Sequence, residues 1–518
     1  MFGTALSQLR YGMAVLTNRR IRPQDIERIA HDLIATLAEF GEPGADSALL
    51  PGQAGSVDPA VRRTVTERSL RATAVTAARH TAHYRRTFDV LGLDPATLTP
   101  ETWDRVPVTP KEALRALPAA FVSAASTPAL MALTTGTSGT PTAVWFSRDE
   151  VEISVAMSTV SAVLGMGLRP RHTLAYAGCS RATLPLLNVE ESVTRIGASF
   201  VQIGTVDPAV ALDRLAAPLG LPGKAPQITH LTVSASYLAA LVEEAERNGW
   251  HASDFGLESI GVGGEVLSDP LRERAAAALG ARITTAYMMT ESIPSGGTPC
   301  TEGHLHHTTE FGHLEILDPV THEPTPPGSV GVIVQTPYVP YRDCTLLLRY
   351  ATGDLVARPD AEPTCELAHL PATSPVLGRW SGPRSVAVPT RSVLNLLESE
   401  PDVPLPARYA LADGPGAGRA GADSAGADSM GANRAGADGP RADRPGSTVL
   451  HVLVRRLPAA ALLGRLEERA TAAGLALDAI VLHDDPATLP PTGPVRADLR
   501  EHTFESARPA AARVASPA

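Results

Sequence analysis

Residues 133–146 (LTTGTSGTPTAVWF) bring hydroxyl groups and glycines together in one short run. Apolar residues precede the run and the β-favouring residues Ala143 to Phe146 follow it, so the pattern predicts strand, turn and strand. Gly136 and Gly139 can adopt backbone angles closed to other residues, which lets the turn direct successive N–H groups toward an anion. Further donors are the hydroxyls of Thr134, Thr135, Thr137 and Ser138. This chemistry suits a polyphosphate, although the same composition also fits an ordinary polar hairpin.

Two more polar motifs follow predicted strands farther along the chain. The strand Ile260–Val262 leads into Gly263-Gly264-Glu265, and the strand Ile283–Ala286 leads into the run Tyr287–Glu291 (YMMTE). In open α/β sheets, ligands bind outside the carboxyl ends of the strands. We therefore expect both motifs to border one crevice.

The elements that must position these motifs alternate between strand and helix. Residues 172–178, 198–203 and 228–234 have the pattern of short buried strands, with helical stretches between them. Ser147 and Glu150 form a capping box at the start of one helix, and Asp269 with Pro270 marks the start of another. The fold class predicted is α/β: a large N-terminal domain with mixed and parallel sheets flanked by helices, followed by a small mobile α+β domain.

The order of these motifs resembles that of the adenylate-forming superfamily, which includes acyl-CoA synthetases, luciferases and nonribosomal adenylation domains. The run TTGTSGTPT is similar to the phosphate-binding loop of that superfamily, and its Gly-x-Pro-Thr ending is most similar to the phenylacetate–coenzyme A ligase branch. An upstream helix with Tyr84, Arg85, Arg86 and Phe88 also resembles that branch, although a surface helix with a basic side would contain the same arginines. The resemblance covers residues 60–380 well and the C-terminal region weakly.

The resemblance implies a role for residues around the phosphates of ATP. The glycine- and hydroxyl-rich loop would hold the β- and γ-phosphates through residues 134–139. Glu291 would bind Mg²⁺, and Thr290 would contact the α-phosphate.

The resemblance also implies an adenosine site. Gly264 and Glu265 would line the adenine pocket, and Tyr287 would stack near the base. Asp354, which ends a Tyr-x-Thr-Gly-Asp motif, would accept hydrogen bonds from the ribose hydroxyls, and Arg379 would lie near the same sugar.

A group of cysteines and histidines suggests a metal site. Many proteins of the resembled branch have a cysteine and a Gly-x-His segment after the glutamate motif and a cysteine pair farther on, and Cys300, His306 and Cys365 match three of these positions. The fourth position is not a cysteine, so His369 or Cys344 could complete a tetrahedral site. The sequence predicts structural Zn²⁺ here, or unligated side chains in a loop.

Three departures from the resembled pattern affect function. The family inserts a lysine from a C-terminal Gly-Lys segment, whereas this chain has Gly493-Pro494, which leaves Arg496 as the candidate substitute cation and Arg500 as a weaker one. Met288 replaces a glycine that borders the acyl pocket. Trp-Ser-Gly-Pro follows Arg379 where the family usually has acidic hinge residues.

Composition limits the possible partners and compartments. The chain has 518 residues and a net charge of −10, which argues against nucleic acid as the main partner. The sequence has no apolar run long enough to cross a membrane, no recognisable signal peptide and only four cysteines, so a cytoplasmic protein without a membrane partner is expected.

We expect three regions along the chain. Residues 1–59 hold one helix, from Pro23 to Phe40, and a linker; residues 60–380 form the large domain; and residues 381–518 form the small domain. An Ala/Gly/Asp-rich insertion at 415–446 interrupts the small domain and has too few apolar residues to order itself.

The predicted function is ATP-dependent activation of a carboxylic acid to an acyl-adenylate, followed by transfer to coenzyme A or to a carrier-protein thiol. Two alternatives remain open at this stage: an enzyme that passes the acyl group to an amine or another nucleophile, and a nucleotide-binding pseudoenzyme without the catalytic lysine.

Overall fold

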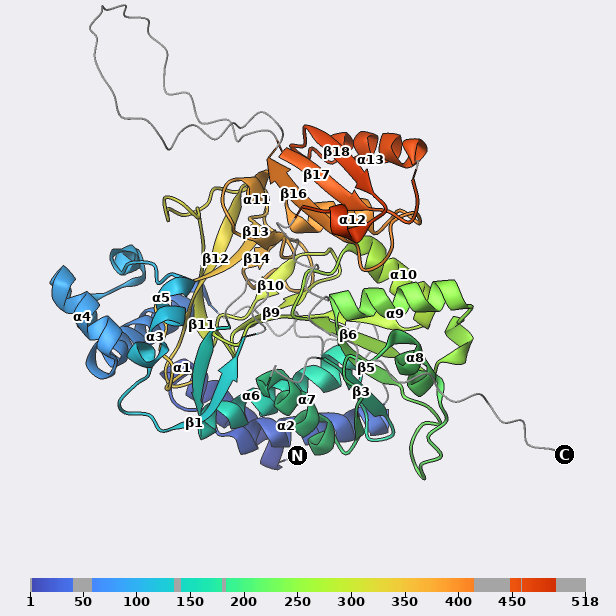
Figure 1. Ribbon diagram of the computed structural model, residues 1–518. Coiled ribbons are helices and arrows are strands. Elements are labelled where there is room, and N and C mark those ends of the chain that lie inside the picture. The colour runs from blue at the N-terminus through green and yellow to red at the C-terminus, as the bar shows by residue number, and fades with distance from the viewer. Residues whose placement is uncertain are drawn as a thin grey trace, which may run out of the picture. The chain divides into compact units, whose positions relative to one another are not determined.

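The computed structural model describes residues 2–40, 58–134, 141–178, 183–413, 448–457 and 459–490, and the account below concerns those residues. They form two compact units: one extends to Trp380 and the other begins at Ser381 (Figure 1). Each unit is described separately. No helix in the described part of the chain is both long enough and apolar enough to cross a membrane.

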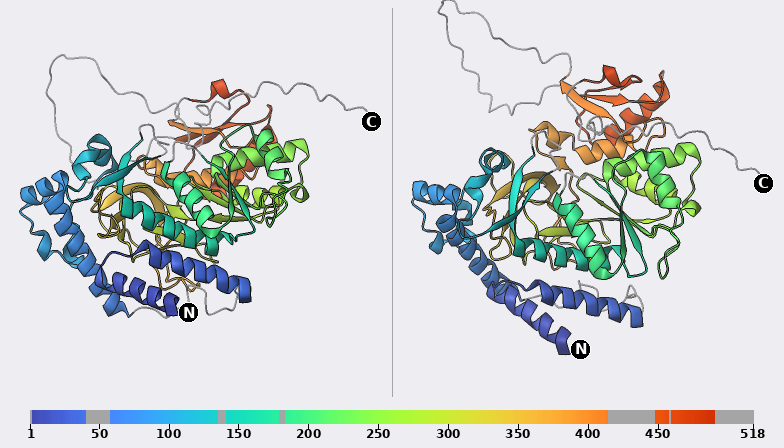
Figure 2. Two further views of the ribbon diagram at one scale, coloured as in Figure 1. Left: turned by 90° about the horizontal axis from the view of Figure 1, so that it is seen from below. Right: turned by 60° about the horizontal axis from the view of Figure 1, so that its bottom comes forward.

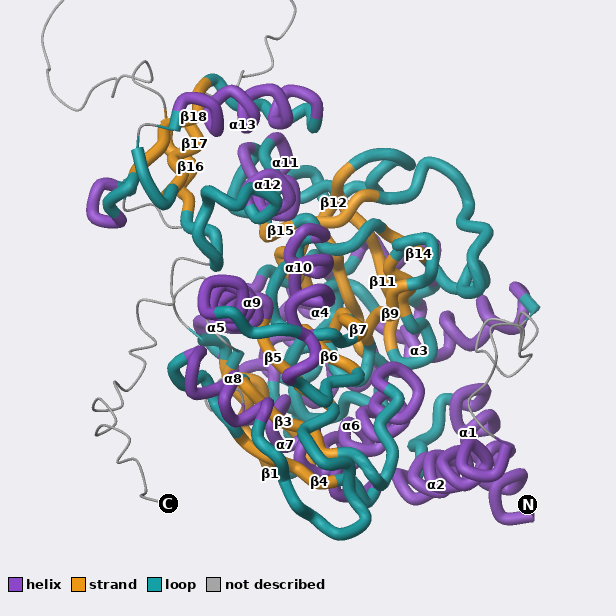
Figure 3. Tube along the Cα trace, turned by 90° about the vertical axis from the view of Figure 1, so that its right-hand side faces the viewer, coloured by secondary structure: helices purple, strands orange, loops and turns teal. Residues whose placement is uncertain are grey.

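A five-stranded parallel sheet is the centre of the first unit. Its strand order is β4 (Ser199–Gln202), β3 (Thr173–Ala177), β5 (His230–Ser234), β6 (Ser259–Gly263) and β7 (Arg282–Thr285). Helices α6 (Arg148–Ser161) and α7 (Thr183–Ile196) lie on one side of the sheet, and α8 (Pro208–Ala216), α9 (Ala235–Asn248) and α10 (Asp269–Leu279) lie on the other (Figures 1 and 3). The predicted α/β class, with a parallel sheet covered on both faces, is confirmed.

Helix starts agree with the sequence patterns to within one residue. Ser147 and Glu150 form the expected capping box of α6. Ser268, rather than Asp269, caps α10, and its side chain accepts a hydrogen bond from the N–H of Leu271. Helix α5 (Lys111–Ala116) begins directly after Pro110.

Antiparallel strands form the rest of the first unit. One sheet has the order β11 (Gly312–Leu317), β12 (Val330–Pro337), β13 (Tyr350–Ala357) and β15 (Gly378–Arg379); a second has β14 (Ala372–Thr373), β10 (Leu305–His307), β9 (Gly296–Pro299) and β8 (Tyr287–Met288). The apolar segment 344–349 lies outside these strands and forms only an isolated bridge, between Thr345 and Val122. Strands β1 (Pro128–Leu133) and β2 (Ala143–Ser147) form the hairpin predicted around the glycine-rich turn.

The N-terminal helices pack on the first unit at more than one place: α2 (Pro23–Phe40) contacts α6, and α5 contacts β13. These helices are α1 (Phe2–Thr17), α2, α3 (Pro59–His80) and α4 (Ala82–Leu91), followed by α5 and the short helical turns η1 (Pro95–Thr97), η2 (Pro100–Arg105) and η3 (Pro118–Phe121). Helix α2 has the predicted bounds, whereas α1 was not predicted. The phenol of Tyr84 lies 3.0 Å from the hydroxyl of Thr109 and accepts a 2.7 Å hydrogen bond from the N–H of Leu348. These bonds fix the start of α5 next to the start of β13.

The second unit is a small α+β structure. Strand β17 (Thr448–Leu453) pairs antiparallel with β16 (Tyr409–Asp413) and parallel with β18 (Ala479–His483). Helices α11 (Arg384–Ala387), α12 (Thr390–Leu397) and α13 (Ala460–Ala472) complete it. The insertion 415–446 lies outside the described residues.

Candidate active site

Glu291 lies at the centre of a buried charged cluster. Its carboxylate is 3.0 Å from the ammonium of Lys111, and the two side chains are only 2% and 12% exposed. The phenol of Tyr350 donates a hydrogen bond of 3.1 Å to the same oxygen, Oε1. Burial, together with the nearby carboxylate of Glu291, raises the pKa of Tyr350 well above its ordinary value, so this phenol remains a donor.

Three separate segments supply these side chains. Glu291 occupies the turn after β8, Tyr350 begins β13, and Lys111 begins α5. Thr109 forms a parallel bridge with Tyr350, which places Lys111, two residues later, next to the start of β13. The contact therefore depends on packing between the N-terminal helices and the β13 sheet.

Asp354 is the second buried carboxylate of the cluster. The phenol of Tyr287 donates a 2.9 Å hydrogen bond to its Oδ2, and Nε of Arg379 lies 3.3 Å from its Oδ1. Pairing between β13 and β15 places Arg379 directly opposite Asp354. Burial raises the pKa of Asp354, while the charges of Arg379 and Lys111 and the bond from Tyr287 oppose that shift. Asp354 and Glu291 therefore belong to one charged site.

Tyr287 is held by two contacts. Its hydroxyl is bound to Asp354, and its ring meets the ring of His307 edge-on, with centroids 5.9 Å apart. His307 is fully buried and lies 2.9 Å from the hydroxyl of Thr373, and burial lowers its pKa to about 4. An imidazole of this kind stays neutral and serves to position the tyrosine. Thr290 is half-buried in the turn directly before Glu291.

Glu265 has a capping contact that the sequence did not indicate. Its carboxylate accepts hydrogen bonds from the N–H (2.7 Å) and the hydroxyl (2.9 Å) of Ser236, in the first turn of α9. Gly264 has a φ of +81°, a conformation that favours glycine, and lies directly after β6. The loop after β6 is therefore bound to the start of α9, which directly follows β5 at the carboxyl edge of the parallel sheet.

The glycine-rich turn is described only at its base. The N–H of Thr134 donates to the carbonyl of Thr142, and the N–H of Thr142 donates to the hydroxyl of Thr134. These bonds close the hairpin between β1 and β2. The predicted phosphate-binding residues Thr135, Gly136, Thr137, Ser138 and Gly139 lie outside the described residues, as do Pro494 and Arg496.

Sequence reasoning missed Lys111, although the sequence holds two signals for it. Lysine occurs twice in the chain, at 111 and 224, against 43 arginines, so a lysine at position 111 is unusual for this composition. It also occupies the first position of a helix, where the helix dipole disfavours a positive charge. A lysine at such a position is consistent with a local role for its positive charge, here the contact with Glu291.

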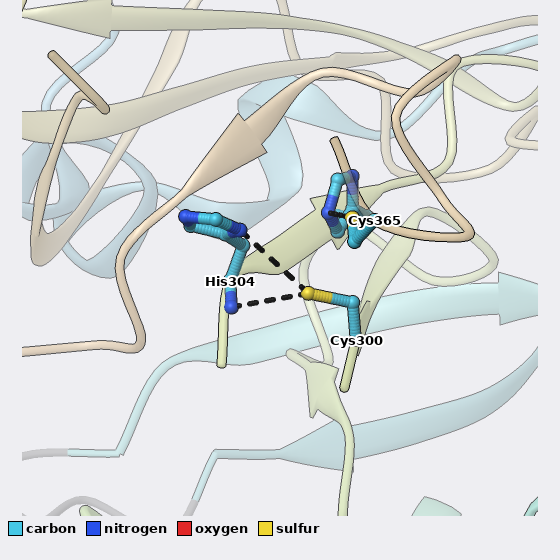
Figure 4. Close-up of side chains that lie close together, drawn as sticks. Cys300, His304 and Cys365 are labelled. Carbon is cyan, nitrogen blue, oxygen red and sulfur yellow. Dashed lines mark hydrogen bonds between the residues drawn. The ribbon is translucent and has the colours of Figure 1, made fainter. Parts of the chain in front are cut away.

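The predicted metal residues come together around β9 and β10. Cys300, His304, His306 and Cys365 each offer a ligand atom, and these four atoms lie within 4.8 Å of one another. Figure 4 shows three of these residues close together: Cys300, His304 and Cys365. Sγ of Cys365 is 3.0 Å from Nε2 of His306, and Sγ of Cys300 is 3.7 Å from Nδ1 of His304. His304 takes the fourth position, for which the sequence had suggested His369 or Cys344.

Contacts around the four residues orient them. Nδ1 of His306 lies 3.2 Å from the carbonyl of Leu370, which directs its Nε2 toward the thiols, an arrangement common for metal-bound histidine. Glu366 accepts hydrogen bonds from the N–H and hydroxyl of Thr301, so it joins the two cysteine-bearing loops. Two cysteines and two histidines are a donor set suited to tetrahedral Zn²⁺. Cys344 lies elsewhere, fully buried, and its N–H donates to Glu150.

Comparison with known proteins finds sequence similarity to phenylacetate–coenzyme A ligases. No family model matches the chain. It is 28% identical over 310 residues to a phenylacetate–coenzyme A ligase of Thermus thermophilus, a match that covers 57% of this chain and 65% of that relative. A phenylacetate–coenzyme A ligase of Pseudomonas putida is 28% identical over 322 residues, covering 60% of this chain and 70% of that protein.

Solved structures extend the similarity of fold. A 2-hydroxyisobutyryl-CoA ligase, solved in a postadenylation state with 2-HIB-AMP, superposes with a TM-score of 0.62 at 19% identity, over 86% of this chain and 90% of that one. The same ligase with R3-HIB-AMP gives a TM-score of 0.61. The chain is thus a sequence relative of the phenylacetate–coenzyme A ligases and has the fold of an adenylate-forming acyl-CoA ligase.

Proposed function

We propose that this protein is an AMP-forming acid–thiol ligase. It activates a carboxylic acid with ATP to give an acyl-adenylate and then transfers the acyl group to a thiol. The observation that carries the proposal is the buried cluster of Lys111, Glu291, Tyr350 and Asp354, at the place where the motif order of an adenylate-forming enzyme predicts the nucleotide. The relatives that are named phenylacetate–coenzyme A ligases support coenzyme A as the acceptor. A carrier-protein thiol is the second candidate acceptor.

In this proposal Asp354 and Tyr287 bind the nucleoside. Each carboxylate oxygen has two lone pairs, so Asp354 can accept ribose hydroxyls while it keeps its bonds to Tyr287 and Arg379. The charge of Arg379 opposes the rise in the pKa of Asp354 that burial causes. Gly264 and Glu265 border the adenine, with Glu265 fixed by the first turn of α9.

Glu291 is the proposed Mg²⁺ ligand, with Thr290 beside the α-phosphate. Carboxylate oxygen is a ligand type that Mg²⁺ prefers, and the ion would neutralise phosphate charge during attack. The bond from Tyr350 fixes the orientation of the Glu291 carboxylate. The loop 134–139 would bind the outer phosphates.

Lys111 is the proposed charge-stabilising cation. Attack of a carboxylate on the α-phosphorus concentrates negative charge, and a fixed cation there lowers the barrier. Lys111 is largely buried beside Glu291, so its ammonium would supply positive charge next to the phosphate oxygens if the Glu291 carboxylate held Mg²⁺. This assignment supplies the positive charge that Pro494 cannot. Arg496 stays a candidate for the same role.

A structural Zn²⁺ bound by Cys300, His304, His306 and Cys365 completes the proposal. The four residues hold together the β9–β10 hairpin, which follows the Glu291 turn, and the loop before β14. The metal would therefore stabilise the segment that positions Glu291 and Tyr287 and would take no part in the reaction.

The test is acid-dependent pyrophosphate release with ATP and a panel of carboxylic acids, followed by a thioester assay with coenzyme A. We expect release that depends on the acid and on Mg²⁺, and a loss of at least ~10-fold in Glu291→Gln, because one charged contact is removed. Nucleotide binding without any release would favour a pseudoenzyme. Release without thioester formation would favour another acceptor.

A further inference from the structure

Arg349 is a buried residue with an uncommon backbone conformation. Its φ is +46°, in the left-handed region that residues with a side chain rarely adopt, and its side chain is 4% exposed. Such a conformation persists only where the surrounding contacts hold it, and it is concentrated at functional sites. Arg349 directly precedes Tyr350, whose phenol binds Glu291. The contacts of Arg349 therefore bear on the geometry of the charged cluster.

The guanidinium of Arg349 joins two segments that are far apart in the sequence. Its Nε and Nη2 lie 3.0 and 2.9 Å from the two carboxylate oxygens of Glu315, on β11. Its Nη1 donates to the backbone carbonyls of Asp104 and Val106, at 3.0 and 2.7 Å. These carbonyls lie around the end of η2, so the guanidinium holds the segment that leads to α5 against the antiparallel sheet. Figure 2 shows the N-terminal helices, in blue, beside the yellow strands of that sheet.

The backbone of Arg349 holds the same segment at a second place. Its carbonyl accepts a 2.8 Å hydrogen bond from the N–H of Thr109, and the N–H of Ala351 donates to the carbonyl of Thr109 at 3.0 Å. The N–H of Arg349 donates to the hydroxyl of Thr336, on β12, at 2.8 Å. In the left-handed conformation, the side chain and the carbonyl of one residue thus both bind the segment 104–109, while its N–H stays bound to the sheet.

We propose that Arg349 is a positioning residue that sets the place of the Lys111 ammonium beside Glu291. This inference rests on the proposed role of Lys111 in adenylation. Lys111 follows Thr109 by two residues, and Thr109 is bound to the carbonyl of Arg349. Tyr350 is the next residue after Arg349, so both groups that contact the Glu291 carboxylate are attached to the backbone at the place that Arg349 fixes. A catalytic group must stay within about 0.5 Å of its productive position, so loosening this place should reduce the rate.

The geometry of the guanidinium explains why arginine suits this task. Its planar fork offers five donors, which can satisfy a carboxylate and two carbonyls at once. A lysine at position 349 would keep the charge beside Glu315, but its single nitrogen could not also bind the carbonyls of Asp104 and Val106. The two carbonyl bonds, rather than the ion pair, connect Arg349 to the segment that carries Lys111.

Amine labelling of the full chain measures the position of Lys111 without any activity. The chain has only two lysines, 111 and 224, so acetylation by a limiting amount of acetic anhydride can be measured at each by peptide mass spectrometry, with Lys224 as the internal reference. We expect Arg349→Gln to raise the labelling rate of Lys111 relative to Lys224 by at least ~10-fold, because the ammonium leaves its buried ion pair. The matched control is Arg169→Gln. Arg169 is also a buried arginine whose Nη1 binds two backbone carbonyls, and its loss should leave the labelling ratio within ~2-fold of the wild type.

Acid-dependent pyrophosphate release separates positioning from other effects. Arg349→Gln should lower kcat by about 10-fold and leave the KM for ATP within about 3-fold, because the nucleoside-binding Asp354 keeps its contacts with Tyr287 and Arg379. In a Lys111→Met background, the same change should lower kcat by less than about 2-fold more, because its effect acts through the missing ammonium. A change that acts through another part of the site would lower kcat equally in both backgrounds.

Three results would overturn the inference. If Lys111 stays protected from labelling in Arg349→Gln, the ammonium is placed without Arg349, and if kcat falls equally with and without Lys111, Arg349 acts elsewhere. If Arg349→Gln does not fold, Arg349→Lys keeps the charge beside Glu315, and its new lysine is measured separately by its position in the chain. Normal protection of Lys111 in that variant would exclude the role. A wild type that releases no pyrophosphate would instead refute the proposed function, and the labelling ratio alone would then decide whether Arg349 places Lys111.

Discussion

Replacing Lys111 with methionine tests the central feature of the site. Methionine keeps a similar length and removes the ammonium that lies 3.0 Å from Glu291. Glu291 is then a carboxylate that is 2% exposed, with the phenol of Tyr350 as its remaining donor. The change therefore tests two contributions of the Lys111 ammonium. One is to the free energy of unfolding, through its ion pair with Glu291, and the other is to the rate of adenylation.

The structure sets the size of both effects. Removing one partner of a buried ion pair costs about 3–5 kcal/mol. Because Lys111 is 12% exposed and Tyr350 still donates, we expect the lower part of that range or less, about 2–3 kcal/mol, in the free energy of unfolding. Loss of a charge-stabilising group in the transition state costs about 3–4 kcal/mol, which lowers kcat by a factor of ~10²–10³.

The assay combines urea unfolding with acid-dependent pyrophosphate release. The double variant Lys111→Met with Glu291→Gln should recover most of the lost stability, because no buried charge is left unpaired, but should stay inactive. Lys224→Met is the matched control, because the ammonium of Lys224 binds the backbone carbonyls of Pro170 and Gly197 and none of the site residues. Its loss should change the free energy of unfolding and leave kcat unchanged. If Lys111→Met keeps kcat within about 3-fold of the wild type, the catalytic role is refuted.

Three further predictions concern the metal, acid stability and the C-terminal cation. Elemental analysis should find about one zinc per chain, lost in Cys300→Ser and Cys365→Ser but retained in His369→Ala and Cys344→Ser; a folded, metal-free wild type would exclude the site. His172 and His230 are buried, with pKa values lowered to about 3 and about 4 by burial and by neighbouring charges, so the unfolded chain binds more protons below pH 6.5. Stability should therefore fall as pH drops from 6.5 toward 4, by up to about 1.4 kcal/mol per unit for each imidazole, and less for His172, which has Glu258 at 3.4 Å. Urea midpoints from pH 7.5 to 4.5 should show a smaller slope in His172→Gln/His230→Gln; equal slopes would contradict this account. If Lys111 is the catalytic cation, Arg496→Ala should leave the rate of pyrophosphate release within about 3-fold of the wild type. Loss of release in Arg496→Ala would assign that role to Arg496. Faster release in Pro494→Lys would show that the wild-type reaction lacks a cation.

The sequence predicted most of the elements because their signals are local. Capping residues, proline positions and apolar periodicity act within a few residues, and they located α2, α6 and the five parallel strands closely. The segment 344–349 shows where such signals fail. Its residues Leu346 to Leu348 favour a strand by composition, but they are buried against the N-terminal helices, where burial rather than sheet pairing selects apolar residues.

The sequence also determined the types and order of the site residues. Glu291, Asp354 and Arg379 follow strands or belong to them, and strand direction brings their side chains to one edge. It could not predict that Glu265 binds the first turn of α9, because the contact with Ser236 depends on the relative position of two adjacent βα loops.

By itself, then, the sequence determined the fold class, the motif order and three of the four metal-binding candidates, since each rests on residue type and short-range spacing. Only the tertiary structure selected His304 over His369 and Cys344, and only it brought Lys111 to Glu291. Both contacts join residues on separate elements, and their geometry is set by how the β9–β10 hairpin and the start of α5 pack. Packing of that kind depends on the shapes of surfaces formed after the chain has folded, so no local pattern of residues encodes it.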